Sequence, residues 1–159
     1  MMAPYSRTLF DLLCEQSEKA PQAIAVVSRG APISYDDLCR RSRAVAASLR
    51  ARGVKRGDRV GAILSNCVEW LEMAFVACAA GATFVPLSTW STRNELDFLI
   101  ADSQIKLLVS HARLGDRDFE ADFAILAPEL AQSARSARFP DLHEIVLLDA
   151  DLPTKFGRY

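Results

Sequence analysis

Short apolar runs alternate with amphipathic stretches along this chain, and glycine or proline stands between many of them. Short apolar runs of strand length are typical of strands buried on both faces of a parallel sheet. We expect such strands at residues 60–64, 84–85, 105–110 and 145–149. Apolar residues that recur every three or four positions are typical of helices. We expect helices over residues 9–19 and 35–52, between residues 66 and 81, and around residues 96–103.

The predicted helices begin and end at recognisable residues. At four places a side chain that can cap a helix stands three residues before a carboxylate, the spacing at which the two satisfy each other's free amide groups. These pairs are Thr8 and Asp11, Ser34 and Asp37, Asn66 and Glu69, and Thr92 and Glu95. Gly81 can end the third helix in a left-handed conformation.

Two segments lie outside this alternation. Residues 23–28 and 32–34 predict a hairpin around Arg29-Gly30. Residues 111–140 are less regular, and residues 119–126 fit either a helix or a strand; we favour two short helices here.

The order of strands and helices predicts the fold class. Strands that alternate with helices pair in parallel, and right-handed crossovers place the helices on the faces of the sheet. A chain of 159 residues is typical of one domain. We therefore predict a single α/β domain over residues 1–159, with a parallel-rich sheet covered by helices.

Composition and charge argue against several classes of partner. Nineteen basic and twenty acidic residues give a formal net charge of −1, and no basic tract offers a surface to nucleic acid or to an anionic membrane. No apolar run approaches the ~18 residues of a membrane span, and the first residues lack a signal-peptide core. We therefore expect a cytoplasmic protein. The cysteines form no C-x-x-C pair and predict small buried thiols in helices: Cys14, Cys39, Cys67 and Cys78.

Few residues suggest chemistry by their spacing. Gly53, Gly57 and Gly61 stand four apart, which fits neither phosphate-loop motif, and we assign the first two to a turn between helix and strand. His111 and His143 are isolated in the sequence, so we expect them to be solvated or locally bonded. No Ser, His and Asp group into a triad. We therefore predict no catalytic residue and no metal ligand in this chain.

The two tryptophans differ in their predicted surroundings. Trp70 lies within a predicted helix and is expected in the core, whereas Trp90 lies in a loop just after a strand. Parallel sheets tend to bind ligands at the carboxyl ends of their strands, where His111 is also expected. An exposed tryptophan at such an edge is a candidate surface for stacking or packing.

Four segments combine into a more specific pattern. Residues 33–38 read I-S-Y-D-D-L, residues 57–60 read G-D-R-V, residues 79–87 read A-A-G-A-T-F-V-P-L, and residues 95–103 read E-L-D-F-L-I-A-D-S. In order and spacing they resemble the early motifs of adenylate-forming acyl-activating enzymes: acyl-CoA synthetases, 4-coumarate-type ligases and peptide-synthetase adenylation domains. Alanine stands where the K-A-G-x-x-x-V-P-L motif usually has a basic residue. The resemblance extends from about Thr8 to about Asp149 and implies the first part of the family's large amino-terminal domain.

The resemblance also implies a parent reaction. An ATP-dependent acyl-CoA synthetase or ligase joins a carboxylic acid substrate to AMP and then passes the acyl group to a thiol, with ATP, Mg²⁺ and coenzyme A as cofactors of the full-length protein. The family's phosphate loop, its Y-G-x-T-E segment, its ribose-binding aspartate and its carboxy-terminal lysine have no counterpart here. We therefore expect an amino-terminal fragment or a truncated paralogue, which serves as scaffold, binds no cofactor alone and is inactive by itself.

The loop after the V-P-L motif lines the coenzyme A path in related acyl-CoA synthetases, and Ser88, Thr89 and Trp90 occupy that place here. The match is positional, because related enzymes often have glycines there. Truncation would expose a face of the sheet, so self-association is expected. The alternative is a stand-alone α/β binding or interaction module, with a polar surface and a monomeric state.

Overall fold

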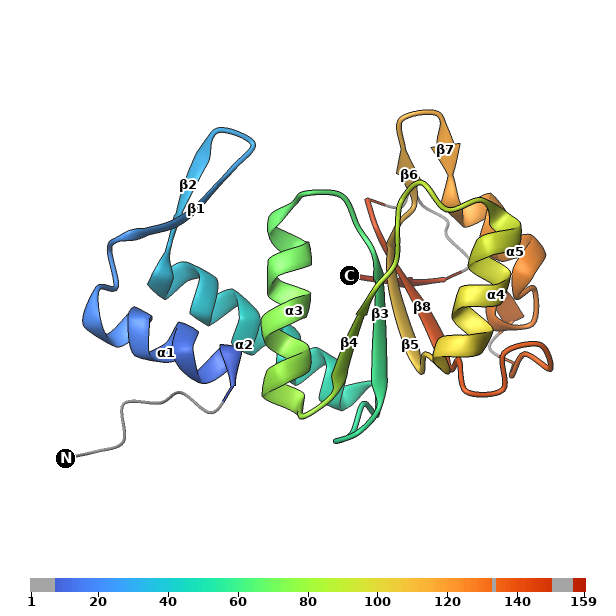
Figure 1. Ribbon diagram of the computed structural model, residues 1–159, viewed down its shortest axis with the longest axis horizontal. Helices are drawn as coiled ribbons and strands as arrows, with labels where there is room; N and C mark the ends of the chain where they lie inside the picture. Colours follow the sequence, from blue (N-terminus) through green and yellow to red (C-terminus); the bar gives the residue numbers. More distant parts are fainter. Residues whose placement is uncertain (1–7, 133, 150–155) are drawn as a thin grey trace. The chain divides into compact units, whose positions relative to one another are not determined.

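The computed structural model describes residues 8–132, 134–149 and 156–159. The chain divides into two compact units, which are coloured along the sequence in Figure 1. Unit 1 comprises residues 1–57 and 66–84, and unit 2 comprises residues 58–65 and 85–159. The assignment of residues 1–159 to a single domain stays a prediction.

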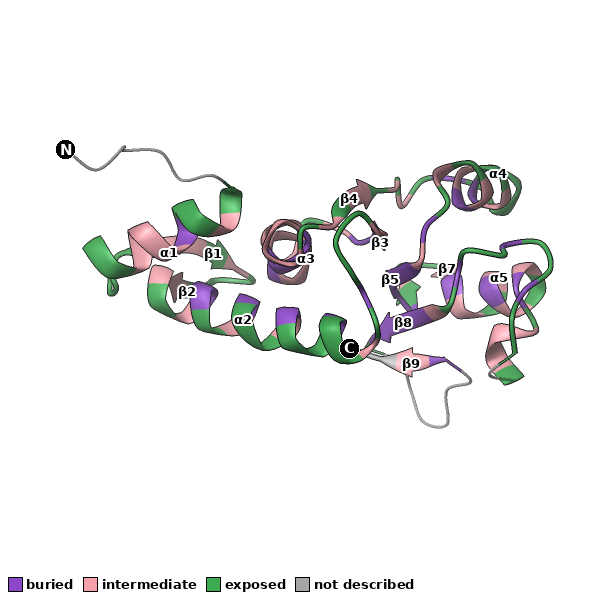
Figure 2. Cartoon of the chain, turned by 90° about the horizontal axis from the view of Figure 1, so that it is seen from below, coloured by how far each residue is buried: buried purple, intermediate pink, exposed green. Residues whose placement is uncertain are grey.

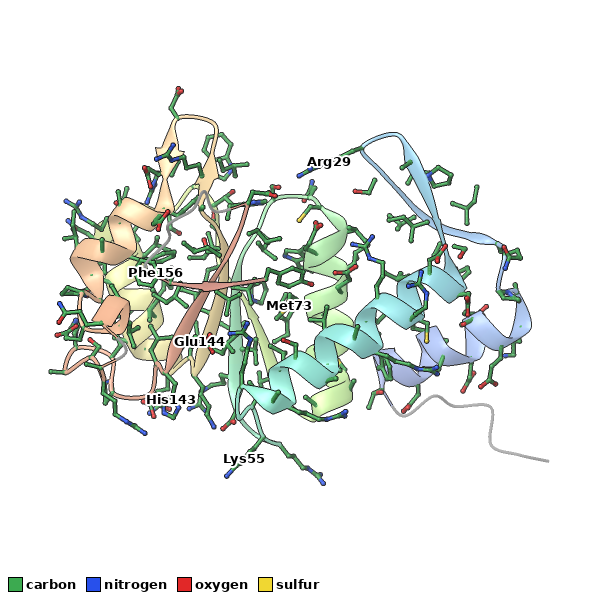
Figure 3. The ribbon with its side chains drawn as sticks, turned by 180° about the vertical axis from the view of Figure 1, so that it is seen from behind. Arg29, Lys55, Met73, His143, Glu144 and Phe156 are labelled. Atoms are coloured by element: carbon green, nitrogen blue, oxygen red, sulfur yellow. The ribbon has the colours of Figure 1, made fainter. Side chains whose placement is uncertain are left out.

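Unit 1 is a group of three helices with a hairpin. Its elements are α1 (Leu9–Lys19), β1 (Ile24–Ser28), β2 (Ala31–Ser34), α2 (Tyr35–Ala51) and α3 (Val68–Ala80). The antiparallel hairpin turns at Arg29 and Gly30, as the sequence predicted, and both residues have positive φ. Figure 3 shows Arg29 at the tip of this hairpin.

Capping side chains fix the start of most helices. Thr8 and Asp11 form a complete capping box at α1, and Thr92 and Glu95 form another in unit 2. Ser34 Oγ accepts the Asp37 N–H at the start of α2. The prediction that Asn66 caps α3 is wrong. Cys67 is the N-cap residue and its side chain makes no capping hydrogen bond, because the backbone stays extended for one residue beyond Asn66.

The three helices of unit 1 enclose a small apolar core. Leu13, Leu38, Cys39 and Val68 are its buried members, and aromatic residues such as Phe10 and Phe75 pack against it. Figure 2 shows the buried positions of α2 along one side of the helix and exposed positions along the other, the pattern of an amphipathic helix.

A charged pair joins α2 to α3 beside this core. Glu72 is 1% exposed, and its Oε1 accepts from Arg41 Nε at 2.5 Å. A buried carboxylate without a partner would be costly, so the guanidinium compensates the burial of Glu72 and fixes how the two helices pack.

Unit 2 is built on parallel strands. Its elements are β3 (Arg59–Ile63), α4 (Arg93–Ser103), β5 (Leu107–His111), β6 (Arg113–Leu114), β7 (Arg117–Asp118), α5 (Phe119–Leu126), the 3₁₀ turn η1 (Leu130–Gln132), β8 (Glu144–Leu148) and β9 (Gly157–Arg158). The chain passes between the units within β4 (Thr83–Pro86). The sheet order is β4-β3-β5-β8-β9, and the pairs β3–β5, β5–β8 and β8–β9 are parallel. The predicted α/β class with a parallel-rich sheet is confirmed.

The apolar core of unit 2 lies between the sheet and two helices. Leu96 and Ile100 of α4 and Phe119 and Phe123 of α5 are buried with Ile63 and other strand residues. Phe156 also joins this core, with its ring centroid 6.3 Å from that of Phe123, and it is labelled in Figure 3. The segment that fitted helix or strand, residues 119–126, is the helix α5.

The residues between β5 and α5 form a second hairpin, which the sequence did not predict. Strands β6 and β7 pair through Arg113 with Asp118 and Leu114 with Arg117. Two residues per strand carry too little periodicity to be recognised in a sequence. Gly115 lies in this turn with φ +59°.

Gly81 ends α3 in the left-handed conformation, with φ +68° and its N–H donated to the carbonyls of Ala77 and Cys78. Its own carbonyl accepts from Gly57 N at 2.9 Å. A Cβ at Gly81 would lie 3.1 Å from Arg56 Cγ, which is tighter than ordinary packing. Both observations confirm the helix stop that the sequence predicted.

We predict that Gly81→Val lowers the free energy of unfolding by about 1–3 kcal/mol, because a β-branched residue is strained at this φ. Urea denaturation followed by circular dichroism measures the loss. Gly81→Asn is the matched control, since asparagine tolerates the left-handed region better, and it should lose clearly less. Equal stability of the valine variant and the original chain would contradict the prediction.

Candidate functional site

The strands of unit 2 bring several polar residues to one edge of the sheet. In the parallel registers Ile63 lies opposite Ser110, and His111 lies opposite Leu148, so β3, β5 and β8 end at the same edge. Leu87 N donates to Ala62 O at 2.8 Å, which places the start of the loop after β4 beside the end of β3. This carboxyl edge is where parallel sheets bind ligands, and it is the candidate site.

A histidine and a serine meet at this edge. His111 is only 4% exposed, and its Nε2 lies 3.0 Å from Ser65 Oγ and 3.2 Å from Ser65 N. The backbone N–H can only donate, so Nε2 accepts and the imidazole is neutral with its proton on Nδ1. Of the two alternatives expected for His111, solvated or locally bonded, the first is wrong because the side chain is buried. The ring is bonded instead to Ser65 at the end of the neighbouring strand.

The distances between Ser65 and His111 resemble those of a nucleophile and its base, which lie about 2.6–3.2 Å apart. However, the same lone pair of Nε2 also accepts the Ser65 amide, so the hydroxyl shares its acceptor. Because both Ser65 groups contact this one nitrogen, they hold the segment after β3 against the end of β5. The arrangement supports a positioning contact between two strand ends.

The three residues predicted for the coenzyme A path form one tight turn. Ser88 Oγ accepts from Trp90 N at 3.1 Å, and Ser88 O accepts from Ser91 N at 3.2 Å. The turn leads into the capping box of α4, with Ser91 almost fully buried. The indole of Trp90 is 91% exposed. An aromatic plane on a hydrogen-bonded turn is available for stacking, but no ligand contact tests this role.

A shallow hollow of about 420 Å³ lies on α4 close in sequence to this turn. It is lined by Ser91, Asn94, Glu95, Phe98 and Leu99. The ring of Phe98 is 62% exposed, so this part of α4 presents apolar surface.

Unit 1 has a hollow of similar size, about 410 Å³, between the hairpin and the start of α3, where Trp70 contributes to the wall. Trp70 is thus half-buried, with its ring edge against Phe84, and is less enclosed than the sequence predicted.

The charges of unit 2 are mostly paired near the ends of helices and strands. Hydrogen bonds from Thr92, first from its backbone N–H, lower the pKa of Glu95. Desolvation, with the charges of Arg135 and Lys106, lowers the pKa of His143, which is exposed as expected. Lys106 Nζ lies 2.7 Å from Asp58 Oδ2 at the beginning of the strands, far along β5 from its carboxyl end. These contacts stabilise the beginning of α4 and of the strands.

Two kinds of feature are not found in the described part of the chain. Residues 8–132, 134–149 and 156–159 contain no group of three or more His, Cys, Asp or Glu side chains placed to hold a metal ion. Within the same residues, no helix has both the length and the apolar character to cross a membrane.

Comparison with known proteins gives the family. The family model of AMP-binding enzymes matches residues 13–153. Acyl-CoA ligase SID4 of Ajellomyces capsulatus is 31% identical over 139 residues, which cover 87% of this chain and 23% of the relative. Tyrocidine synthase 3 of Brevibacillus parabrevis is 35% identical over 112 residues, which cover 70% of this chain and 2% of the relative. The chain therefore spans at most about a quarter of these relatives.

Solved structures agree on the fold. A putative long-chain-fatty-acid CoA ligase from Rhodopseudomonas palustris superimposes with a TM-score of 0.75 at 20% identity, over 98% of this chain and 36% of that one. Coronafacic acid ligase from Pectobacterium brasiliense gives a TM-score of 0.75 at 21% identity, over 95% of this chain and 28% of that one. Together with the family match over most of its length, the fold and the ordered motifs show that this chain belongs to the AMP-binding, adenylate-forming enzyme family.

Proposed function

We propose that this chain is the amino-terminal scaffold of an ATP-dependent acyl-CoA synthetase or ligase, an enzyme that forms an acyl-adenylate and transfers the acyl group to a thiol. The observation that carries the proposal is the family match over residues 13–153. In this proposal ATP, Mg²⁺, coenzyme A and a carboxylic acid substrate belong to the larger enzyme. A cytoplasmic location stays a prediction.

The places of the family motifs support a scaffold role in unit 1. In the segment at residues 33–38, Ser34 caps α2, while Ile33, Tyr35 and Leu38 pack in the core. In the segment at residues 79–87, Gly81 stops α3 so that the chain can enter β4. Each of these residues therefore has a structural role: it caps a helix, ends a helix or packs in the core.

The same is true of unit 2. In the segment at residues 95–103, Glu95 completes the capping box of α4. Leu96 and Ile100 enter the core, and Ser103 Oγ donates to the Leu99 carbonyl. Catalysis of adenylate formation needs positioned positive charge around the phosphates. The sequence of 159 residues contains no counterpart of the family's phosphate loop that would supply it.

We predict that the 159-residue chain alone gives no acyl-adenylate. With a panel of carboxylic acids, ATP–pyrophosphate exchange should stay at the level of a reaction without protein, while an intact ligase of the family, assayed in parallel, shows exchange. Exchange above background that scales with the concentration of this chain, and that survives repurification, would overturn the scaffold proposal.

We further propose that the Ser88–Thr89–Trp90 turn faces the coenzyme A path of the larger enzyme. Its support is the exposed indole of Trp90 and the hydrogen bonds that hold the turn at the carboxyl edge of the sheet. An indole contributes a flat surface on which an adenine ring can stack, a contact worth about 1–3 kcal/mol for bases on aromatic side chains.

The test of this turn belongs in the full-length ligase, because the chain alone is expected to bind no cofactor. We predict that Trp90→Ala in that enzyme raises the KM for coenzyme A about tenfold, since the stacking surface is lost, and leaves the adenylation half-reaction unchanged. Trp70→Phe, at the other tryptophan, is the control and should leave the KM for coenzyme A unchanged. An unchanged KM for coenzyme A in the Trp90→Ala enzyme would overturn the assignment.

We also propose that the chain self-associates through apolar surface. Each unit leaves large apolar side chains exposed, among them Ile24 and Val27 of the hairpin in unit 1 and Trp90 and Phe98 in unit 2. Contiguous apolar patches beyond a few hundred Å² are uncommon on monomers.

We predict that the sedimentation coefficient rises with concentration in the micromolar range and that a hydrophobic dye binds. A single monomeric species that binds no dye would favour a stand-alone interaction module.

A further inference from the structure

Two cysteines far apart in the sequence meet inside unit 1. Cys14 lies on α1 and Cys39 lies on α2, and their Sγ atoms are 3.5 Å apart. Both thiols are free, and Cys39 is a member of the buried core against which Cys14 packs. Within the described residues, Cys67 and Cys78 have no comparable sulfur neighbour. The packing of α1 on α2 has therefore placed one pair of thiols in contact.

The two thiols differ in solvent exposure, so an oxidant in solution meets them in a fixed order. Cys39 is 2% exposed, whereas Cys14 is only partly buried and can be reached from solvent. Arg43, one turn along α2 from Cys39, places its Nη2 3.5 Å from Cys14 Sγ. Attack on a disulfide in solution requires a sulfur that the disulfide can reach, so Cys14 is the thiol that reacts first. Burial, together with the neighbouring Cys14 thiol, raises the pKa of Cys39.

We propose that Cys14 and Cys39 form a reversible intramolecular disulfide when the chain meets a low-molecular-weight disulfide such as glutathione disulfide. The Cys14 thiolate attacks one sulfur of glutathione disulfide, which forms a mixed disulfide and releases one glutathione thiolate. Cys39 then loses its proton to solvent and attacks the Cys14 sulfur, which releases the second glutathione thiolate. Two protein thiols are oxidised, and one disulfide is reduced to two glutathione molecules.

The bond requires a movement of the two sulfur atoms. They must approach from 3.5 Å to about 2.05 Å. The bond would close a loop that contains the β1–β2 hairpin, and it would restrict the unfolded chain. Oxidation should therefore stabilise unit 1. This inference is independent of the proposed ligase function.

The test uses the chain itself in glutathione buffers of increasing oxidation. After acid quenching, the number of thiols that react with a maleimide should fall from four to two, and peptide mapping should place the bond between Cys14 and Cys39. The midpoint of thermal unfolding should rise by several degrees on oxidation, and a reducing agent should reverse the rise. The Cys67→Ser/Cys78→Ser double variant is the matched control and should behave like the original chain.

The single variants separate the two steps. Cys39→Ser should stop at the mixed disulfide and carry one glutathione on Cys14. Cys14→Ser should leave Cys39 unmodified in the folded state, because it is buried. The proposal is overturned if all four thiols of the original chain stay reactive in buffers that oxidise ordinary protein dithiols. It is equally overturned if glutathione or a disulfide appears at Cys67 or Cys78 while Cys14 and Cys39 stay reduced.

Discussion

The absence of a side chain at Gly61 is the constraint on which unit 2 depends. A Cβ there would lie 2.7 Å from Ile105 Cδ1 and 2.9 Å from Leu108 Cδ1, so the ends of these buried side chains would have to shift. Gly61 lies opposite Leu108 in the parallel register. That pairing fixes the whole of β3 against β5, and two residues further on it sets Ile63 beside Ser110. The contact between Ser65 and His111 is thus a consequence of packing near the middle of the strands.

The helix boundaries could be predicted from the sequence because their causes are local. A capping box needs two side chains three residues apart, and those at Thr8 and Thr92 are both complete. Asn66 shows the limit of this reasoning, since it has the same pattern but stands one residue too early. Val68, which is buried in the core of unit 1, is the first helical residue, so the core and not the capping pattern sets where α3 begins.

The candidate site was less predictable than the fold because it depends on register. The strand end before His111 could be recognised, and His111 was expected at the carboxyl edge of a parallel sheet. Whether His111 faces solvent or the interior depends on which residue of β5 pairs with which residue of β8, and no local pattern gives that register. The contact between Cys14 and Cys39 escaped prediction for a similar reason, since it depends on how α1 packs on α2.

The end of α3 shows how packing can supply a feature that the local sequence lacks. Residues 79 and 80 are both alanine, and the last turn of α3 has no basic side chain of its own. Arg50 of α2 donates from Nη2 to the Ala79 carbonyl at 3.1 Å. A cation near the carboxyl end of a helix satisfies free carbonyls and complements the helix dipole. A positive charge therefore reaches the end of α3 from a neighbouring helix, beside the stop at Gly81.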